Sequence, residues 1–206
     1  MAFISMDDKV RIITAIADAE RRTAGEIVCI VSRSASSYIY VPILWAALAA
    51  LAAPWALIRF TMLSVETIHL IQLALFIVLA VVLCLLPLPM RMAMTPAFIK
   101  RHRASRAARE QFVANDLVQT EGRTGCLIYV AEAEHHAEVL ADEGIAAKVG
   151  PEVWRQAITV LTDALRDGRT ADGFIGAIRL CGTVLAEHVP PHPDDTNELP
   201  NRLIML

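Results

Sequence analysis

Residues 41–58 read VPILWAALAALAAPWALI and carry no charged side chain over 18 positions. A second run at 67–90, TIHLIQLALFIVLAVVLCLLPLPM, carries none over 24 positions. About 20 apolar residues in a helix are enough to cross the ~30 Å hydrocarbon core of a bilayer. Both runs are apolar all round, whereas core helices of soluble proteins are apolar along one stripe. The sequence therefore predicts two transmembrane helices, at 41–58 and 68–90.

The connection between these two runs is very short, and only Arg59 and Glu66 are charged between 41 and 90. We therefore expect an antiparallel transmembrane hairpin. The first 25 residues contain several charged side chains and lack the apolar core of a signal peptide. The membrane segment is therefore expected to be the hairpin rather than an N-terminal leader.

Positive charge is concentrated on the segments that flank the hairpin. Residues 91–110 contain six Lys and Arg side chains and a single acid, Glu110, whereas the hairpin loop holds only Arg59. Positive charge stays on the cytoplasmic side, so we expect both termini to be cytoplasmic at a bacterial inner (plasma) membrane. The basic run 100–109 either contacts anionic headgroups, at roughly 1 kcal/mol per charge, or is a solvated helix face that only sets the topology.

The remainder of the chain is expected to form one interrupted domain. The 206 residues are 55% hydrophobic with a net charge of −3, which excludes general disorder and gives no basic field for nucleic acid. Residues 1–40 supply only one helix and one strand, too little for a core of their own, so they are expected to join 91–189. Residues 190–206 are rich in Pro and Asp, and we expect a loosely ordered tail.

The pattern of apolar residues predicts an α/β fold. The strands expected at 26–33 and 126–131 are apolar on both faces, as in a sheet covered by helices on both sides. A helical connection between them favours parallel pairing, and a short turn makes the strand at 136–142 antiparallel to the second. Helices are expected at 7–22, 95–118, from 151 and from 170. The prediction is an α/β/α sandwich around a small mixed sheet.

Several short motifs occur in an order that resembles the TPM domain family. They are Thr23-x-Gly25-Glu26-Ile27, RTGCLIYVA at 123–131, Ala141-Asp142-x-Gly144-Ile145 and LAEHVP at 185–190. That family is named for a thylakoid-lumen acid phosphatase. The resemblance implies an α/β/α sandwich, with phosphatase activity in some members and calcium binding in others. This sequence departs from the family pattern in lacking an export signal and in carrying a membrane hairpin after its first strand.

Candidate site residues gather at one edge of the predicted sheet. Glu26 and Arg123 lie where the first two strands begin, Asp142 lies where the third ends, and Glu20 is close in sequence to Glu26. Carboxylate oxygens are ligands for calcium or magnesium, and an arginine can hold a phosphate oxygen. We therefore predict a cation site at Glu20, Glu26 and Asp142 and a phosphate contact at Arg123. The alternative is that these residues form ordinary salt bridges and helix caps.

Two other groups of residues are candidates for chemistry. The turn at 132–136 carries Glu132, Glu134, His135 and His136, which could bind a transition metal or face the basic run 100–109. The four cysteines, Cys29, Cys84, Cys126 and Cys181, form no CxxC pair, so core packing of reduced thiols is expected.

The sequence supports two hypotheses of function. The first is a membrane-tethered binding or assembly module on the cytoplasmic face, with the lipid bilayer and a protein as partners, without nucleic acid, and with calcium or magnesium as its cation. The alternative is a metal-dependent phosphatase acting on phosphate esters, in which Glu26 and Asp142 hold the cation and Arg123 the phosphate. We prefer the first because no catalytic nucleophile or general base can be named.

Overall fold

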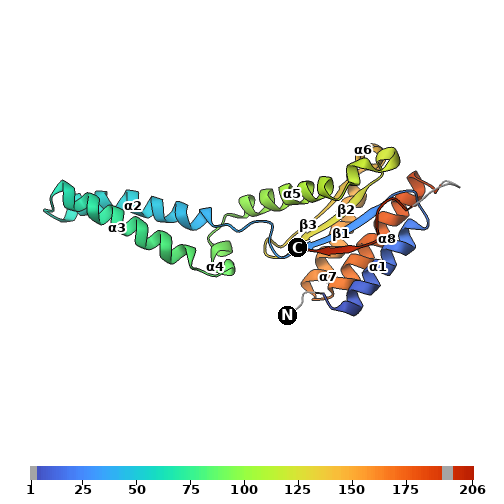
Figure 1. Ribbon diagram of the computed structural model, residues 1–206, viewed down its shortest axis with the longest axis horizontal. Coiled ribbons are helices and arrows are strands. Elements are labelled where there is room, and N and C mark those ends of the chain that lie inside the picture. The colour runs from blue at the N-terminus through green and yellow to red at the C-terminus, as the bar shows by residue number, and fades with distance from the viewer. Residues whose placement is uncertain (1–3, 192–196) are drawn as a thin grey trace. The chain divides into compact units, whose positions relative to one another are not determined.

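The computed structural model describes residues 4–191 and 197–206 of the chain (Figure 1). The chain divides into two compact units. One unit is the segment Ser36–Arg101, which contains both apolar runs. The other unites the residues up to Ala35 with His102–Leu206, so two segments far apart in the sequence build one α/β body.

The first unit is a pair of apolar helices followed by a short one. Helices α2 (Tyr40–Phe60) and α3 (Val65–Cys84) pack side by side, and α4 spans Leu88–Ala93 (Figure 1). Both α2 and α3 are long and apolar enough to cross a membrane. Helix α3 ends at Cys84 rather than at residue 90. Proline lacks the N–H that a helix interior needs, so Pro87 and Pro89 stand only at the start of α4.

The second unit contains a four-stranded mixed sheet in the order β3-β2-β1-β4. Strand β1 (Ile27–Ser32) pairs in parallel with β2 (Cys126–Ala131). Strand β2 pairs antiparallel with β3 (His136–Ala141), so both pairings predicted from the connections are confirmed.

Helices cover both faces of this sheet, which confirms the predicted α/β/α arrangement. Helices α1 (Met6–Glu20), α7 (Pro151–Arg166) and α8 (Thr170–His188) lie on one face, and α5 (Ala97–Ala114) lies on the other (Figure 1). Successive residues of β1 alternate between the two cores. Cys29 and Val31 pack with α1 and α8, and Val28 and Ile30 pack with α5, so the strand is apolar at every position before Ser32.

The C-terminal residues form a strand that the sequence did not predict. Strand β4 (Leu203–Met205) pairs in parallel with β1, and the Leu203 side chain is only 2% exposed. The expectation of a loosely ordered tail is therefore wrong for this segment. Three residues are too few for a periodic signal, and the free edge of β1 supplies the pairing that makes them a strand. Residues 192–196 of the expected tail lie outside the described residues.

Candidate functional site

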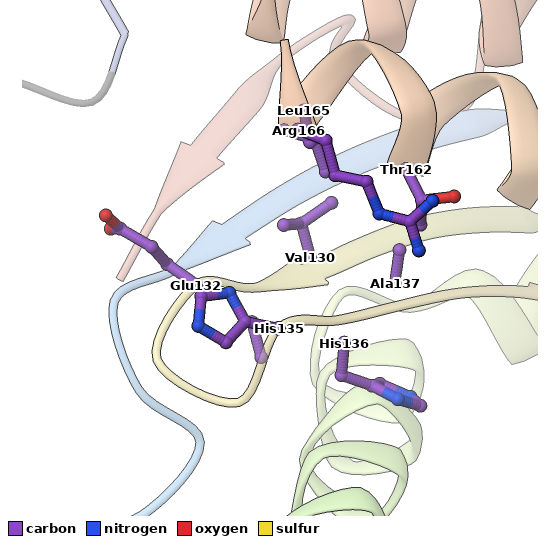
Figure 2. A pocket seen from close by; sticks show the side chains of 9 residues that line it. Val130, Glu132, His135, His136, Ala137, Thr162, Leu165 and Arg166 are labelled. Atoms are coloured by element: carbon purple, nitrogen blue, oxygen red, sulfur yellow. The ribbon is translucent and has the colours of Figure 1, made fainter. Parts of the chain in front are cut away.

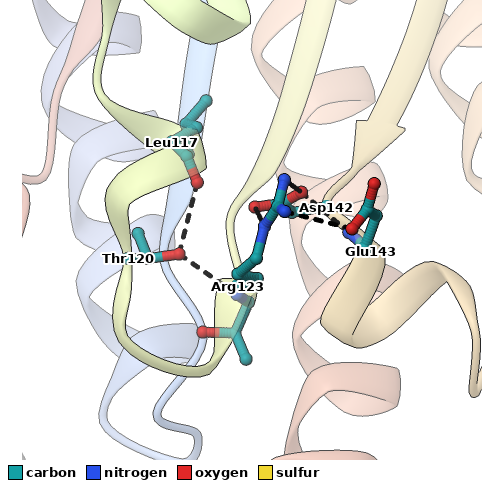
Figure 3. Close-up of polar contacts among 6 residues, drawn as sticks. Leu117, Thr120, Arg123, Asp142 and Glu143 are labelled. Carbon is teal, nitrogen blue, oxygen red and sulfur yellow. Dashed lines mark hydrogen bonds and ion pairs between the residues drawn. The ribbon is translucent and has the colours of Figure 1, made fainter.

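An arginine and two carboxylates meet at the edge where β1 and β2 begin and β3 ends (Figure 3). The Arg123 guanidinium donates from Nε to Asp142 Oδ2 at 3.1 Å and from Nη2 to Asp142 Oδ1 at 3.0 Å. Its Nη1 donates to Glu143 Oε2 at 3.0 Å. Asp142 is buried, whereas Arg123 is half exposed and Glu143 largely exposed. Hydrogen bonding with Asp142 is the main cause that raises the pKa of Arg123.

The backbone around this cluster is held by short-range contacts. Asp142 caps the short helix α6 (Glu143–Ala146), because its Oδ1 accepts the Glu143 N–H at 2.8 Å. The Thr120 hydroxyl accepts the Thr124 N–H at 3.1 Å and donates to the Leu117 carbonyl at 3.2 Å, which fixes the loop before β2 (Figure 3). Both sides of the Arg123–Asp142 pair are therefore held in place by the loops that carry them.

This arrangement bears on the predicted phosphate contact at Arg123. Two nitrogens of its guanidinium bind Asp142 and a third binds Glu143. A phosphate would have to displace these carboxylates, one of which is buried and caps a helix. The geometry is that of a structural ion pair, the alternative that the sequence left open, and phosphate binding at Arg123 stays a prediction.

Two further carboxylates share a cavity near the start of β1. Glu20, the last residue of α1, accepts the Ile27 N–H on Oε1 at 2.8 Å, and Glu26 accepts the Glu198 N–H on Oε1 at 2.9 Å. Both line a cavity of 370 Å³ together with Thr23, Asn197 and other residues. Burial, and then the neighbouring charge of Glu26, raise the pKa of Glu20 to about 8. Its Oε2 is buried without a hydrogen-bond partner among the described residues.

The three carboxylates predicted as cation ligands are thus not all brought together. Glu20 and Glu26 face one cavity, whereas Asp142 is bound by Arg123. The strand order explains the separation, because β2 lies between β3 and β1 and two strand spacings amount to about 10 Å. Within residues 4–191 and 197–206, no three His, Cys, Asp or Glu side chains are grouped so as to hold a metal ion. The sequence identified the correct edge but not the strand order along it.

The opposite edge of the sheet carries a cavity of 480 Å³ (Figure 2). It lies beyond the carboxyl ends of the parallel strands β1 and β2, where α/β sheets usually bind ligands. His135 and Glu132 come from the β2–β3 turn, and Thr162 and Arg166 come from the last turns of α7. Sequence reasoning missed the two α7 residues, because α7 is remote in sequence from the turn. Charges of both signs line the cavity, so it favours neither anions nor cations.

The turn at this edge does not gather its acids and histidines into one group. The Glu134 Oε1 accepts the Ala35 N–H at 2.9 Å, which ties the turn to the segment after β1. His136 Nε2 lies 3.0 Å from Glu138 Oε2, and this contact is the main cause that lowers the pKa of Glu138. His135 has a positive φ of 49°, and both His135 and His136 line the cavity (Figure 2). No transition-metal ligand set forms here among the described residues.

The cysteines of the α/β unit are core residues, as predicted. Cys29, Cys126 and Cys181 are fully buried in the core between the sheet and helices α1 and α8. Burial raises the pKa of the Cys29 thiol, so that the thiolate is disfavoured. These thiols serve packing rather than chemistry.

Comparisons with known proteins agree with this architecture. Residues 88–184 match the family model described as the TPM domain. The fold is similar to the NMR structure of the BA42 protein from the psychrophilic bacterium Bizionia argentinensis, with a TM-score of 0.62 and 19% sequence identity. That alignment covers 99% of this chain and 96% of the other, and at such low identity it shows a shared fold. No curated protein matches the chain.

Proposed function

Because residues 88–184 match the TPM domain model, we propose that the chain carries a domain of the TPM family and is a membrane-anchored binding module on the cytoplasmic face. The anchor is the α2–α3 hairpin, and the module is the α/β unit that the hairpin interrupts. The module recruits a protein partner to the membrane and does not turn over a substrate.

The exposure of the α2 and α3 side chains is the observation that carries the proposal. Trp55 is 84% exposed, Ile58 69% and Leu70 68%, although none of them is polar. Leaving a side chain of this kind in water rather than burying it costs roughly 1.5–3 kcal/mol. A core helix of a soluble protein would be mostly buried, and these helices are not. A lipid environment removes the cost for every such side chain along both helices.

The charge pattern supports the cytoplasmic side. Arg91 and the basic residues of α5 follow the hairpin, whereas its other end carries one basic residue, Arg59, in the last turn of α2. Basic flanks remain cytoplasmic, so the loop lies outside and both parts of the α/β unit lie inside. The segments before and after the hairpin build one domain, so both must lie on the same side of the membrane. This requires an even number of spans between them, and the hairpin supplies two.

The state of the charged groups supports binding over phosphate hydrolysis. Phosphoryl transfer needs a cation to bridge phosphate oxygens and a free arginine or lysine to stabilise their charge. Arg123 is instead engaged by Asp142 and Glu143, and Asp142 caps α6. No observation on these residues favours the phosphatase over the binding module.

We place the cation of this module at the acid pair Glu20 and Glu26. The two carboxylates share a cavity with the side chains of Thr23 and Asn197, an oxygen-rich set of the kind that calcium and magnesium prefer. The buried Oε2 of Glu20 has no hydrogen-bond partner in the described part of the chain. This oxygen is therefore available as a ligand for a cation. Only two carboxylates contribute, so we expect weak binding, in the millimolar range.

Reporter fusions to the full chain test the anchor and its orientation. Green fluorescent protein fused after Leu206 should fluoresce, because it folds in the cytoplasm, and alkaline phosphatase inserted after Met62 should be active outside. Extraction of the chain from membranes by alkaline carbonate, or the reverse pattern of reporter activity, would contradict the proposal.

Purified full-length protein in detergent tests binding against turnover. We expect no hydrolysis of p-nitrophenyl phosphate with calcium or magnesium, and a rise in Tm with millimolar calcium that Glu26→Gln abolishes and the exposed Glu152→Gln does not. Hydrolysis that is lost in Asp142→Asn would favour the phosphatase instead. A calcium-induced rise that survives Glu26→Gln would remove the cation from the acid pair.

A further inference from the structure

The inner side of helix α5 packs against the sheet. From His102 onward it belongs to the α/β unit, and Ala104, Ala108 and Phe112 recur every four residues on its inner side. All three are buried in a core with residues of β1 and β2, such as Ile30 and Leu127. The inner side of α5 is therefore fully used by packing.

The outer side of the same helix is basic. His102, Arg106, Arg109 and Val113 are exposed and follow one another at intervals of four, three and four residues, which places them on one stripe of the helix. We call these four residues the outer stripe. The one acidic residue of α5 is Glu110, whose Oε1 accepts from Arg106 Nε at 2.8 Å. Both partners are more than 60% exposed, and such surface pairs exchange readily with other partners.

Chain connectivity limits what this stripe can meet. Twelve residues separate the end of α3 at Cys84 from the start of α5 at Ala97. Even a fully extended segment of that length reaches only about 40 Å. A membrane that anchors α2 and α3 is thus present near α5 at a high effective concentration. The cytoplasmic leaflet of such a membrane is negatively charged and attracts basic residues close to the bilayer.

We propose that the outer stripe of α5 binds the headgroups of anionic phospholipids in the leaflet next to the hairpin. This inference rests on the proposed membrane anchor and adds a second, electrostatic contact to it. Arg106 and Arg109 supply the positive charge, and Val113 lies at the end of the stripe as an exposed apolar contact. The net charge of −3 for the whole chain argues against nucleic acid as the partner.

The test uses the full-length protein in lipid nanodiscs with a fluorescent label at Val113→Cys. The buried Cys29, Cys126 and Cys181 are protected from labelling, and Cys84→Ser removes the half-buried thiol of α3. Nanodiscs of phosphatidylcholine alone are compared with nanodiscs that contain 30% phosphatidylglycerol, each with a trace of headgroup spin-labelled lipid as quencher. We expect quenching only with phosphatidylglycerol at 50 mM salt, and its loss at 500 mM salt, because the contact is screened.

Charge reversal makes the test specific to the outer stripe. Arg106→Glu with Arg109→Glu should lower the ratio of bound to free helix at least about tenfold. Arg155→Glu with Arg166→Glu is the matched control, because both arginines are exposed on α7 and the change in net charge is the same. Quenching should persist in the control.

Three kinds of outcome would overturn the inference. Equal quenching in both lipid compositions, or equal loss in the α7 control, would show that the outer stripe is not the contact. A signal that responds to single-stranded RNA and not to phosphatidylglycerol would assign the stripe to nucleic acid. Failure of the chain to enter nanodiscs at all would instead remove the membrane anchor, and with it both proposals, which separates that result from the first two.

Discussion

The last residue of α1 is tied to the first residue of β1, because Glu20 Oε1 accepts the backbone N–H of Ile27 at 2.8 Å. This bond holds the start of the central strand, but it brings a carboxylate into a cavity that Glu26 also lines. Burial disfavours the charged form of the Glu20 carboxylate, and the neighbouring charge of Glu26 adds a smaller contribution in the same direction. The raised pKa of Glu20, about 8, is the result.

The Glu20 carboxylate should make stability fall as pH rises. Its pKa is about 8 in the folded protein against 4.5 for the unperturbed group, so the folded state binds this proton more tightly. Stability contributed by the proton is fully present below pH 4.5 and is lost as pH rises through 8. Glu20→Gln keeps an oxygen that can accept the Ile27 N–H and carries no charge. We expect this variant to gain on the order of 1–2 kcal/mol near pH 8.5 and little at pH 5.

Thermal unfolding in detergent between pH 5 and pH 9, with a chelator to exclude divalent cations, measures this effect. Glu152→Gln is the control, because the Glu152 side chain is 75% exposed. If the Tm of Glu20→Gln changes with pH in parallel with the Tm of the unsubstituted chain over the whole range, the raised pKa is not that of Glu20.

The Arg123–Asp142 pair should behave as a structural element. Asp142→Ala removes a helix cap and the partner of a guanidinium from a buried position, and we expect a loss of about 2–3 kcal/mol of stability. Glu143→Ala removes an exposed partner of the same guanidinium and should cost less than about 0.5 kcal/mol. Tm values of both variants in detergent check the prediction. If the two substitutions have equal and small effects, the residues are free for ligand binding and the structural interpretation fails.

The fold could be predicted from the sequence where one element shows its pattern by itself. Val28, Cys29, Ile30 and Val31 are apolar in succession, and only a strand with helices on both sides buries every one of them. Leu203 gave no such signal, because it is a core residue only when β1 offers a free edge for pairing. The local sequence pattern thus predicts whether a fully buried element is a strand. A short edge strand can be predicted only together with the strand that it pairs with.

The candidate site likewise separates what local sequence predicts from what depends on long-range pairing. Sequence reasoning placed Glu26, Arg123 and Asp142 at one edge of the sheet, and all three lie there. It did not give the strand order, which separates Asp142 from Glu26 by a full strand. Arg166 lines the cavity at the other edge but comes from α7, and nothing local in the sequence relates it to His135. Distances across a sheet follow from long-range pairing, which one sequence does not reveal.

Gly144 should be intolerant of any side chain. A Cβ at this position would lie 2.1 Å from the Gly122 carbonyl oxygen and 2.6 Å from that of Arg123, and both atoms belong to the backbone. The loop before β2 would have to move, so we expect Gly144→Ala to cost about 3 kcal/mol or more and to disturb the Arg123–Asp142 pair. Gly150→Ala is the control, because a Cβ there meets nothing within 4 Å. Thermal unfolding of both variants tests this prediction. Equal Tm values would contradict the close approach of Gly144 to the backbone of Gly122 and Arg123.

The C-terminal strand should contribute measurably to stability despite its length. Leu203 is 2% exposed and packs in the core beside β1, so Leu203→Ala leaves a cavity and should cost about 2–3 kcal/mol. Met205 lies on the same strand but is 53% exposed, and Met205→Ala should change stability by less than about 0.5 kcal/mol. Hydrogen exchange adds a second measurement, because loss of β4 pairing exposes the Leu206 N–H, which donates to the Val31 carbonyl at 2.9 Å. Rapid exchange of this amide in the unsubstituted protein, together with a silent Leu203→Ala, would mean that the edge of β1 is open and that β4 is not part of the stable sheet.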